Sequence, residues 1–379
     1  MKKQSILLIT RNLPPLVGGM ERLNWHIADE LSKDHTVSII SHTKAKEIAP
    51  QNTKFYGVSL NPLPIFLILA FFQTFLRCLV QRPDILFAGS GLTAPIVVFW
   101  AKVFRKKSII YVHGLDIGTD NKLYNFLWIP CIRNATQVIS NSSPTYDICI
   151  KKRIPSKNLS IIHPGVTYPA KPKDTQLIQQ LKKKYQLENR KILISVGRLT
   201  QRKGLNEFID LSFSKIIKQI PNTILIIIGD TPNQSLNKNL QSKELILSTA
   251  KRHKIENNII FTGNINNDEI LSSFYYLADL HIFPVKHIPH DPEGFGMVAI
   301  EAAAHGTPTI AFATGGIVDA VKDGRSGYLV ESGDYEQLAY KTLLILNQQS
   351  DRATCSKDFA KGFAWENFGK QIKESIENA

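Results

Sequence analysis

The chain has 379 residues, more than the roughly 250–300 at which a single hydrophobic core stops growing, so we expect two domains. Four cysteines without CxxC or metal-ligand spacing argue against a disulfide framework and predict buried thiols in a reducing compartment. Residues 1–170 carry 20 Lys and Arg against 9 Asp and Glu, which indicates an anionic partner such as a membrane surface, or else a solvated basic surface. Nucleic acid is disfavoured, because no recognised binding motif accompanies the charge.

The N-terminal segment predicts a strand, a glycine loop and a helix. The apolar run 5–10 suits a buried parallel strand and is too short for a signal peptide, which favours a cytoplasmic protein. A turn with Gly18 and Gly19 follows, and residues 20–31 have helical apolar spacing. This layout can bind an anion or a sugar at the carboxyl end of a sheet.

Residues 63–80 form the most apolar segment of the chain. The run is shorter than the ~20 residues that a membrane span needs, and it contains Pro64, Gln73 and Arg77. We therefore expect a helix that is buried or partly faces a membrane.

Strands and helices continue to alternate along the N-terminal half. Strands are predicted at 36–41, 84–88, 108–112, 137–140 and 159–162. The strand 108–112 ends at His113-Gly114, a position that suits a site residue in an α/β fold, although a lone His is often structural. The Pro- and Lys-rich stretch 167–173 is typical of a linker between domains.

The second half repeats the alternation and places two cations after its first strand. We predict strands at 191–196, 223–228, 258–262 and 280–284, and a helix at 205–217. Arg198 and Lys203 flank the loop that leads into this helix. Two cations beside a helix N-terminus can neutralise a diphosphate, and a solvated basic loop is the alternative.

A glycine-punctuated loop and helix near the C-terminus form the strongest motif. Gly294 and Gly296 precede a run of helix formers at 297–305, and Gly306 and Pro308 follow where the helix should stop. The helix N-terminus would present backbone N–H groups to a phosphate. Two carboxylates, Glu293 and Glu301, lie eight residues apart, about two helical turns, so we expect both to face one side of the element and accept hydrogen bonds from sugar hydroxyls.

These motifs together resemble glycosyltransferase family 4, whose members are retaining enzymes of the GT-B fold. The resemblance rests on Glu-x7-Glu with its Ala-rich helix, on Gly-Arg-x4-Lys-Gly, and on Pro15-x-x-Gly-Gly-x-Glu21. The segment 293–304 is similar to that of mannosyltransferases acting on phosphatidylinositol mannosides, and related enzymes build lipopolysaccharide and capsule. Where the family usually has Asn-Gly-Val-Asp, this chain has His163 and Thr167, so contacts of those two positions cannot be carried over.

The resemblance implies an α/β protein of two doubly wound Rossmann-like domains facing an interdomain cleft. The N-terminal acceptor domain would span 1–166 and be completed by the C-terminal helix 363–379, which should cross back near Trp365. The donor domain would span 174–360.

The resemblance also implies roles for individual residues. His113, Arg198, Lys203 and Glu293 would be catalytic, with Arg198 and Lys203 binding the donor diphosphate. Gly18, Gly19 and Asp116 would approach the acceptor, with Gly19 also near the diphosphate. The remaining donor contacts would come from the base loop and from the motif around the helix N-terminus: Gly263, Ile265, Glu293, Gly294, Phe295, Gly296, Met297, Val298 and Glu301.

The predicted function is transfer of a hexose from a UDP- or GDP-sugar to a hydroxyl of a saccharide or lipid-linked acceptor in cell-envelope glycan synthesis. Because protein cations can replace a metal ion, we expect no metal cofactor, although His287, His290 and Asp291 are spaced closely enough to consider one. The expected location is cytoplasmic, peripheral at the inner face of the membrane. The alternatives are a sugar-nucleotide epimerase or hydrolase on the same fold, or a non-catalytic sugar-binding protein.

Overall fold

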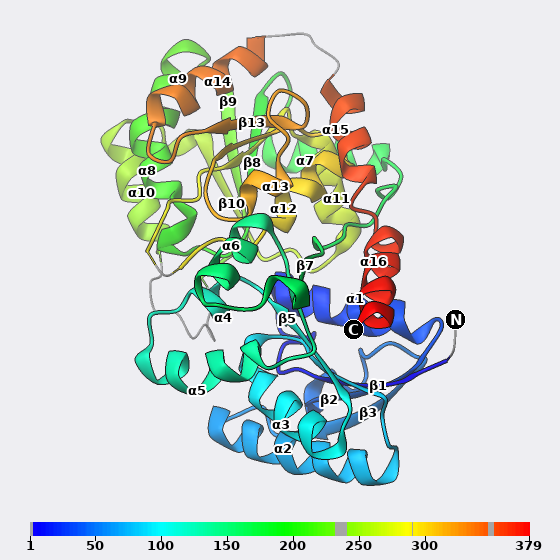
Figure 1. Cartoon of the computed structure of the whole chain (residues 1–379). Coiled ribbons are helices and arrows are strands. Elements are labelled where there is room, and N and C mark those ends of the chain that lie inside the picture. Colours follow the sequence, from blue (N-terminus) through cyan, green and yellow to red (C-terminus); the bar gives the residue numbers. More distant parts are fainter. Residues whose placement is uncertain (1–2, 232–240, 290, 348–351) are drawn as a thin grey trace. The chain divides into compact units, whose positions relative to one another are not determined.

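The computed structural model describes residues 3–231, 241–289, 291–347 and 352–379. The chain divides into two compact units (Figure 1). Of the described residues, unit 1 contains 3–165, 291–295 and 365–379, and unit 2 contains 166–231, 241–289, 296–347 and 352–364.

Unit 1 contains seven parallel strands and their connecting helices. Its elements are β1 (Ser5–Ile9), α1 (Gly19–Ser32), β2 (Thr36–His42), β3 (Thr53–Val58), α2 (Leu63–Val80), β4 (Ile85–Ala88), α3 (Ala94–Phe104), β5 (Lys107–Val112), α4 (Leu115–Gly118), α5 (Lys122–Arg133), β6 (Gln137–Ser140), α6 (Ser143–Lys151), β7 (Leu159–Ile161) and α16 (Trp365–Asn378).

Unit 2 contains six parallel strands. Its elements are α7 (Thr175–Tyr185), β8 (Lys191–Val196), α8 (Leu205–Phe208), the π-helix η5 (Ile209–Phe213), α9 (Ser214–Gln219), β9 (Thr223–Ile228), α10 (Lys243–Arg252), β10 (Ile259–Gly263), α11 (Asp268–Leu277), β11 (Leu280–Phe283), α12 (Met297–Ala304), β12 (Thr309–Phe312), α13 (Ile317–Ala320), β13 (Gly327–Val330), α14 (Tyr335–Asn347) and α15 (Arg352–Lys361).

Both sheets are doubly wound. The strand orders are β3-β2-β1-β4-β5-β6-β7 and β10-β9-β8-β11-β12-β13, so each sheet extends in both directions from its first strand. The central strands are continuous apolar runs buried on both faces, as in β9, because helices cover a parallel sheet on both sides. This architecture confirms the prediction of two Rossmann-like domains.

The predicted strands are found within one or two residues, but several elements of unit 1 were not predicted, among them β3 and α3. β3 is an edge strand whose residues are mostly only partly buried, so its sequence lacks a strong apolar run. α3 is apolar on nearly every side, which removes the helical periodicity that would identify it. The predicted helix 205–217 is interrupted by the π-turn η5, which sequence spacing does not reveal.

The C-terminal helix α16 packs against α1 within unit 1. Trp365 stacks on the His26 ring with 3.7 Å between centroids. Burial lowers the pKa of His26 to about 3, so this ring is neutral and packs as an aromatic surface. Lys373 of α16 also pairs with Asp34.

The cysteines differ from the expectation of four buried thiols. All four are free; Cys78 and Cys149 are buried, Cys131 is partly exposed and Cys355 is exposed. Cys355 lies on the outer side of α15, where a small side chain needs no partner.

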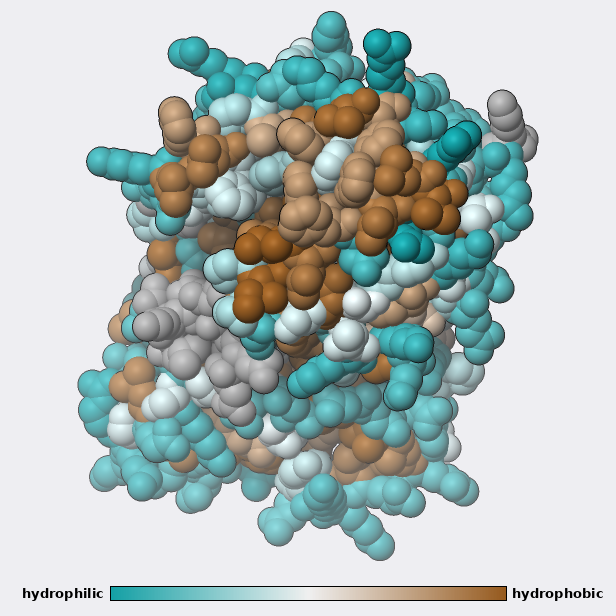
Figure 2. All heavy atoms as spheres, turned by 90° about the horizontal axis from the view of Figure 1, so that it is seen from below, coloured by the Kyte–Doolittle hydropathy of each residue, from teal (hydrophilic) through white to brown (hydrophobic). Residues whose placement is uncertain are grey.

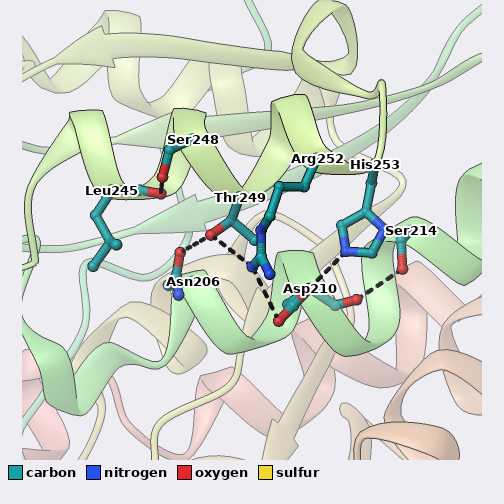
Figure 3. Close-up of polar contacts among 8 residues, drawn as sticks. All are labelled: Asn206, Asp210, Ser214, Leu245, Ser248, Thr249, Arg252 and His253. Carbon is teal, nitrogen blue, oxygen red and sulfur yellow. Dashed lines mark hydrogen bonds and ion pairs between the residues drawn. The ribbon is translucent and has the colours of Figure 1, made fainter.

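A polar network joins α10 to the helix that contains the π-turn (Figure 3). Asp210 accepts a bond from His253 at 2.6 Å and pairs with Arg252 at 3.3 Å. Thr249 donates to Asn206 at 2.8 Å in the same interface. These partners hold the pKa of Asp210 below its ordinary value of 3.8, so the carboxylate stabilises the fold at neutral pH.

We expect Asp210→Asn to lower the free energy of unfolding by about 0.5–1 kcal/mol at pH 7, because the side chain is partly exposed. A lowered folded-state pKa gives stability that is fully present above 3.8 and is lost as pH falls through the lower value. Denaturant unfolding at pH 7 and pH 3 measures this difference. A deficit of the same size at both pH values would contradict the assignment.

Candidate functional site

In unit 2 the candidate site lies at the carboxyl ends of β8 and β11, two adjacent strands. β8 is the strand from which the sheet extends both ways, so the connections that leave β8 and β11 run to opposite faces. The carboxyl edge between such strands is the usual ligand site of an open α/β sheet.

The loop after β8 brings Lys203 over this edge. The Lys203 Nζ lies 4.6 Å from the centroid of the Phe283 ring at the end of β11. Its chain also passes the backbone of Gly197, whose added Cβ would lie 3.5 Å from Lys203 Cε. Arg198 follows Gly197 and is exposed.

The N-terminus of α12 meets the same aromatic ring. Gly296 caps the helix with φ +92°, and a Cβ there would lie 2.9 Å from Phe283 Cε1. The Phe283 ring therefore contacts both the lysine ammonium and the start of the helix. The first-turn amides of Met297 and Val298 have no acceptor one turn earlier in the helix, and with Lys203 they favour an anion.

Glu301 lies one turn further along α12 and is buried. It is 7% exposed, and the Tyr275 hydroxyl of α11 donates to its Oε2 at 3.1 Å. The helix starts at Met297, so Glu293 lies in the preceding loop, and the expectation that helical spacing aligns the two carboxylates is wrong. Glu293 is partly buried and belongs to unit 1, whereas Glu301 belongs to unit 2.

The end of β10 contributes a glycine turn. Gly263 has φ +71° with open space where a Cβ would be, and its carbonyl accepts the Gly229 N–H at 2.9 Å. Ile265 packs partly against the apolar core of this unit. Asn264, between these two residues, is exposed.

His281 of β11 is buried beneath this site as a neutral ring. Burial, and secondarily the nearby Lys203, lowers its pKa to about 3. Its Nδ1 lies 3.1 Å from the Thr309 hydroxyl. The positive charge beside Phe283 is therefore supplied by Lys203 and not by His281.

In unit 1 the corresponding edge lies at the ends of β1 and β4. Gly18 precedes α1, and Glu21 in the first turn is 8% exposed and accepts a bond from Asn12 at 2.7 Å. A Cβ on Gly18 would lie 2.4 Å from Glu21 Oε2, so the glycine leaves room for this carboxylate. Gly19 is the first residue of α1.

His113 joins the ends of β5 and β4. Its Nε2 donates to the Gly89 carbonyl at 2.8 Å. Asp116 accepts the His113 N–H at 2.7 Å and the Gly91 N–H at 2.8 Å. Asp116 thus positions the backbone around His113.

Residues 291–295 pack with unit 1. A Cβ on Gly294 would lie 2.4 Å from the His113 carbonyl oxygen, so only glycine allows this approach. Phe295 is buried and stacks on His163 with 5.3 Å between centroids. Gly294 and Phe295 therefore lie beside the His113 strand end.

Sequence reasoning missed two residues that shape the unit 2 site, Tyr275 and Phe283. Phe283 is the last residue of β11 and lies near the end of the predicted strand 280–284, which was a usable signal. Tyr275 lies on a helix that was not predicted, and nothing in its local sequence links it to Glu301. Among the described residues, no group of three His, Cys, Asp or Glu side chains is placed to hold a metal ion, and His290 lies outside the described residues.

Both units of the chain match models of known protein families. The family model for glycosyl transferases group 1 matches residues 178–361, and that for glycosyltransferase family 4 matches residues 17–168. The chain is a family 4-type glycosyltransferase.

Individual relatives agree with this assignment. The GDP-mannose-dependent alpha-(1-6)-phosphatidylinositol monomannoside mannosyltransferase of Mycolicibacterium smegmatis is 24% identical over 350 residues, which cover 88% of this chain and 87% of the relative. The capsular polysaccharide biosynthesis glycosyltransferase CapM of Staphylococcus aureus is 26% identical over 375 residues, covering 93% and 90%.

The solved structure of Anabaena HepE in complex with UDP superposes with a TM-score of 0.81 at 19% identity, covering 99% of this chain and 100% of that one. This likeness shows the GT-B fold of the glycosyltransferase.

We expect Gly204→Ala to destabilise the glycosyltransferase by about 3 kcal/mol or more, because φ is +65° and the added Cβ would lie 2.2 Å from the Pro284 carbonyl oxygen. Gly324→Ala is the matched control. Its φ is +70° and no atom lies near the added Cβ, so the expected loss is only the cost of about 1–2 kcal/mol for alanine in the left-handed backbone region. Thermal unfolding compares them, and equal losses would show that the Pro284 contact is unimportant.

Proposed function

We propose that this glycosyltransferase transfers a hexose from a UDP- or GDP-sugar to a hydroxyl acceptor with retention of configuration. The observation that carries the proposal is the Phe283 ring, which contacts both the Lys203 ammonium and the Gly296 cap of α12. A cation and a helix N-terminus at one strand edge suit the donor diphosphate.

In this proposal the unit 2 residues bind the donor. Arg198 and Lys203 neutralise the diphosphate together with the amides at Gly296–Val298. Glu301, held by Tyr275, accepts hydrogen bonds from the ribose hydroxyls. The turn at Gly263 and Ile265 contacts the base through main-chain groups. The HepE structure, which contains UDP, supports a nucleotide donor.

The unit 1 residues would serve the transferred sugar and the acceptor. His113 is rigidly held by Gly89 and by the backbone that Asp116 positions, which suits a residue that contacts the sugar. Glu293, with the Gly294 and Phe295 amides, would bind the sugar hydroxyls. Gly18 and Gly19 would leave space for the acceptor and the diphosphate.

We propose front-face attack. The bond between the anomeric carbon and the phosphate oxygen breaks, the acceptor oxygen bonds to the same face of that carbon, and the acceptor proton passes to the leaving phosphate. Arg198 and Lys203 stabilise the negative charge that develops on the phosphate, so turnover would need no metal ion. Turnover after treatment with a chelator tests this point, and anomeric analysis of the product tests retention.

The proposed acceptor is a saccharide or lipid-linked saccharide of the cell envelope, reached from the cytoplasmic face of the membrane. The relatives named for phosphatidylinositol monomannoside and for capsular polysaccharide support this class. The basic charge of residues 1–170 supports an anionic membrane surface.

We expect Lys203→Ala to lower turnover by at least about 100-fold while leaving the melting temperature nearly unchanged, because the leaving group loses its cation. Lys218→Ala, which removes an exposed cation of α9, is the control. Near-normal turnover in the Lys203 variant would defeat the proposed role.

A thermal-shift panel of UDP- and GDP-sugars tests the function itself. A bound donor stabilises the folded protein by mass action, so one class should raise the melting temperature of the wild type. Lys203→Ala should abolish the rise and Lys218→Ala should keep it. If no nucleotide sugar stabilises the wild type, the proposal fails.

A further inference from the structure

Three helices of unit 1, α2, α3 and α5, expose an unusually apolar surface. We call it the α2/α3/α5 face and define it by its exposed large apolar side chains: Ile65, Ile68, Leu69, Phe72, Leu76, Leu79, Val80, Phe99, Val103, Leu123, Phe126 and Leu127. Figure 2 shows apolar residues gathered into a broad field in the view from below, with hydrophilic residues around it. Soluble proteins rarely expose so large a contiguous apolar area without a binding partner.

α2 is apolar on both its inner and its outer side. Phe66, Ala70, Thr74 and Cys78 recur every four residues and are buried, whereas Phe72 and other residues between them are exposed. By its length and hydropathy α2 could cross a membrane, and only 22% of the helix is buried inside the protein. Its inner side packs on β2 and β3, and no element in the described part of the chain covers the outer side, where residues such as Phe72 are exposed.

The two indole donors within these helices are hydrogen-bonded. The Trp100 indole donates to the Phe71 carbonyl at 3.0 Å, and the Trp128 indole donates to the Leu92 carbonyl at 2.9 Å. Phe71 and Trp100 pack with 4.7 Å between centroids and tie α2 to α3. A hollow of about 260 Å³, lined only by apolar side chains such as Ile68, Phe72 and Trp128, opens on this face.

The charge on the same helices has one sign. Residues 63–80, 94–104 and 122–133 contain Arg77, Lys102, Lys122 and Arg133 and no Asp or Glu. Lys102 and Lys122 are exposed. In a two-fold dimer through this face, each copy would bring its own cations to the interface without acidic partners on these helices. Helices that expose apolar side chains and cations and contain no acidic residue instead complement a lipid layer with anionic headgroups.

We propose that the α2/α3/α5 face docks on an anionic lipid bilayer, with the exposed apolar side chains inserted at the headgroup–acyl boundary and Lys102 and Lys122 at the phosphates. This inference builds on the proposed membrane-borne acceptor and identifies the surface and the lipid charge it needs. The helices lie in the plane of the interface and do not cross the bilayer.

Vesicle flotation of the full chain tests the docking. The probes are phosphatidylcholine vesicles with and without about one-third phosphatidylglycerol. We expect the wild type to float with the anionic vesicles and at least about tenfold less with phosphatidylcholine alone. Lys102→Gln/Lys122→Gln should weaken flotation several-fold, and Lys218→Gln/Lys251→Gln, on unit 2, should not.

The apolar contribution is tested with Phe72→Ser/Leu76→Ser/Phe126→Ser. These side chains are exposed, so the fold and melting temperature should be kept while flotation falls at least about tenfold. Leu211→Ser/Leu245→Ser/Tyr340→Ser removes three exposed large side chains from unit 2 and should leave flotation unchanged.

Three results would overturn the proposal: no flotation with either vesicle, equal flotation of the triple variant and the wild type, or a wild-type dimer that the triple variant converts to monomer. The dimer result would show that the α2/α3/α5 face binds a second copy of this chain. Donor stabilisation, measured in the same variants without vesicles, separates this failure from failure of the catalytic proposal. A triple variant that no longer floats but is still stabilised by donor supports docking alone.

Discussion

The structure depends on how parallel strands must be connected. Each connection has to cross a face of the sheet, and in both sheets the connections run in opposite directions from the first strand. The loop after the first strand (β8 or β1) and the loop after its neighbour (β11 or β4) therefore diverge. The carboxyl edge of the sheet between these two strands is left open. In unit 2 these loops carry Lys203 and α12, and in unit 1 they carry the Gly18 turn and the Gly89 carbonyl that holds His113.

Much of the fold follows from local sequence. Buried parallel strands are short continuous apolar runs, and α12 lies between Gly296 and Gly306, two glycines with positive φ, which made its limits readable in advance. β3 was not predicted, because an edge strand needs fewer apolar residues. The π-turn at Ile209–Phe213 packs against α10 and α14, and local sequence spacing contains no information on those contacts.

The candidate site was predictable where one loop supplies several groups, and unpredictable where tertiary contacts decide. Gly204 and Lys203 share a short loop, so their chemistry was visible in the sequence. Tyr275 reaches Glu301 from 26 residues away, and no sequence spacing indicates that bond. For Glu293 and Glu301 the prediction was wrong for a different reason. It applied helical periodicity to both carboxylates, although the helix starts only at Met297 and Glu293 lies in the preceding loop.

The indole side chains lie entirely within one unit. Trp25, Trp100, Trp128 and Trp365 are the four tryptophans of the chain, and all belong to unit 1. Tryptophan fluorescence, excited at the red edge of the absorption band, therefore comes from unit 1 alone. Unfolding of unit 2 would not be detected by this fluorescence. Trp100 and Trp128 lie among the helices of the α2/α3/α5 face, whereas Trp365 stacks on a neutral imidazole, so a quencher confined to lipid would distinguish them.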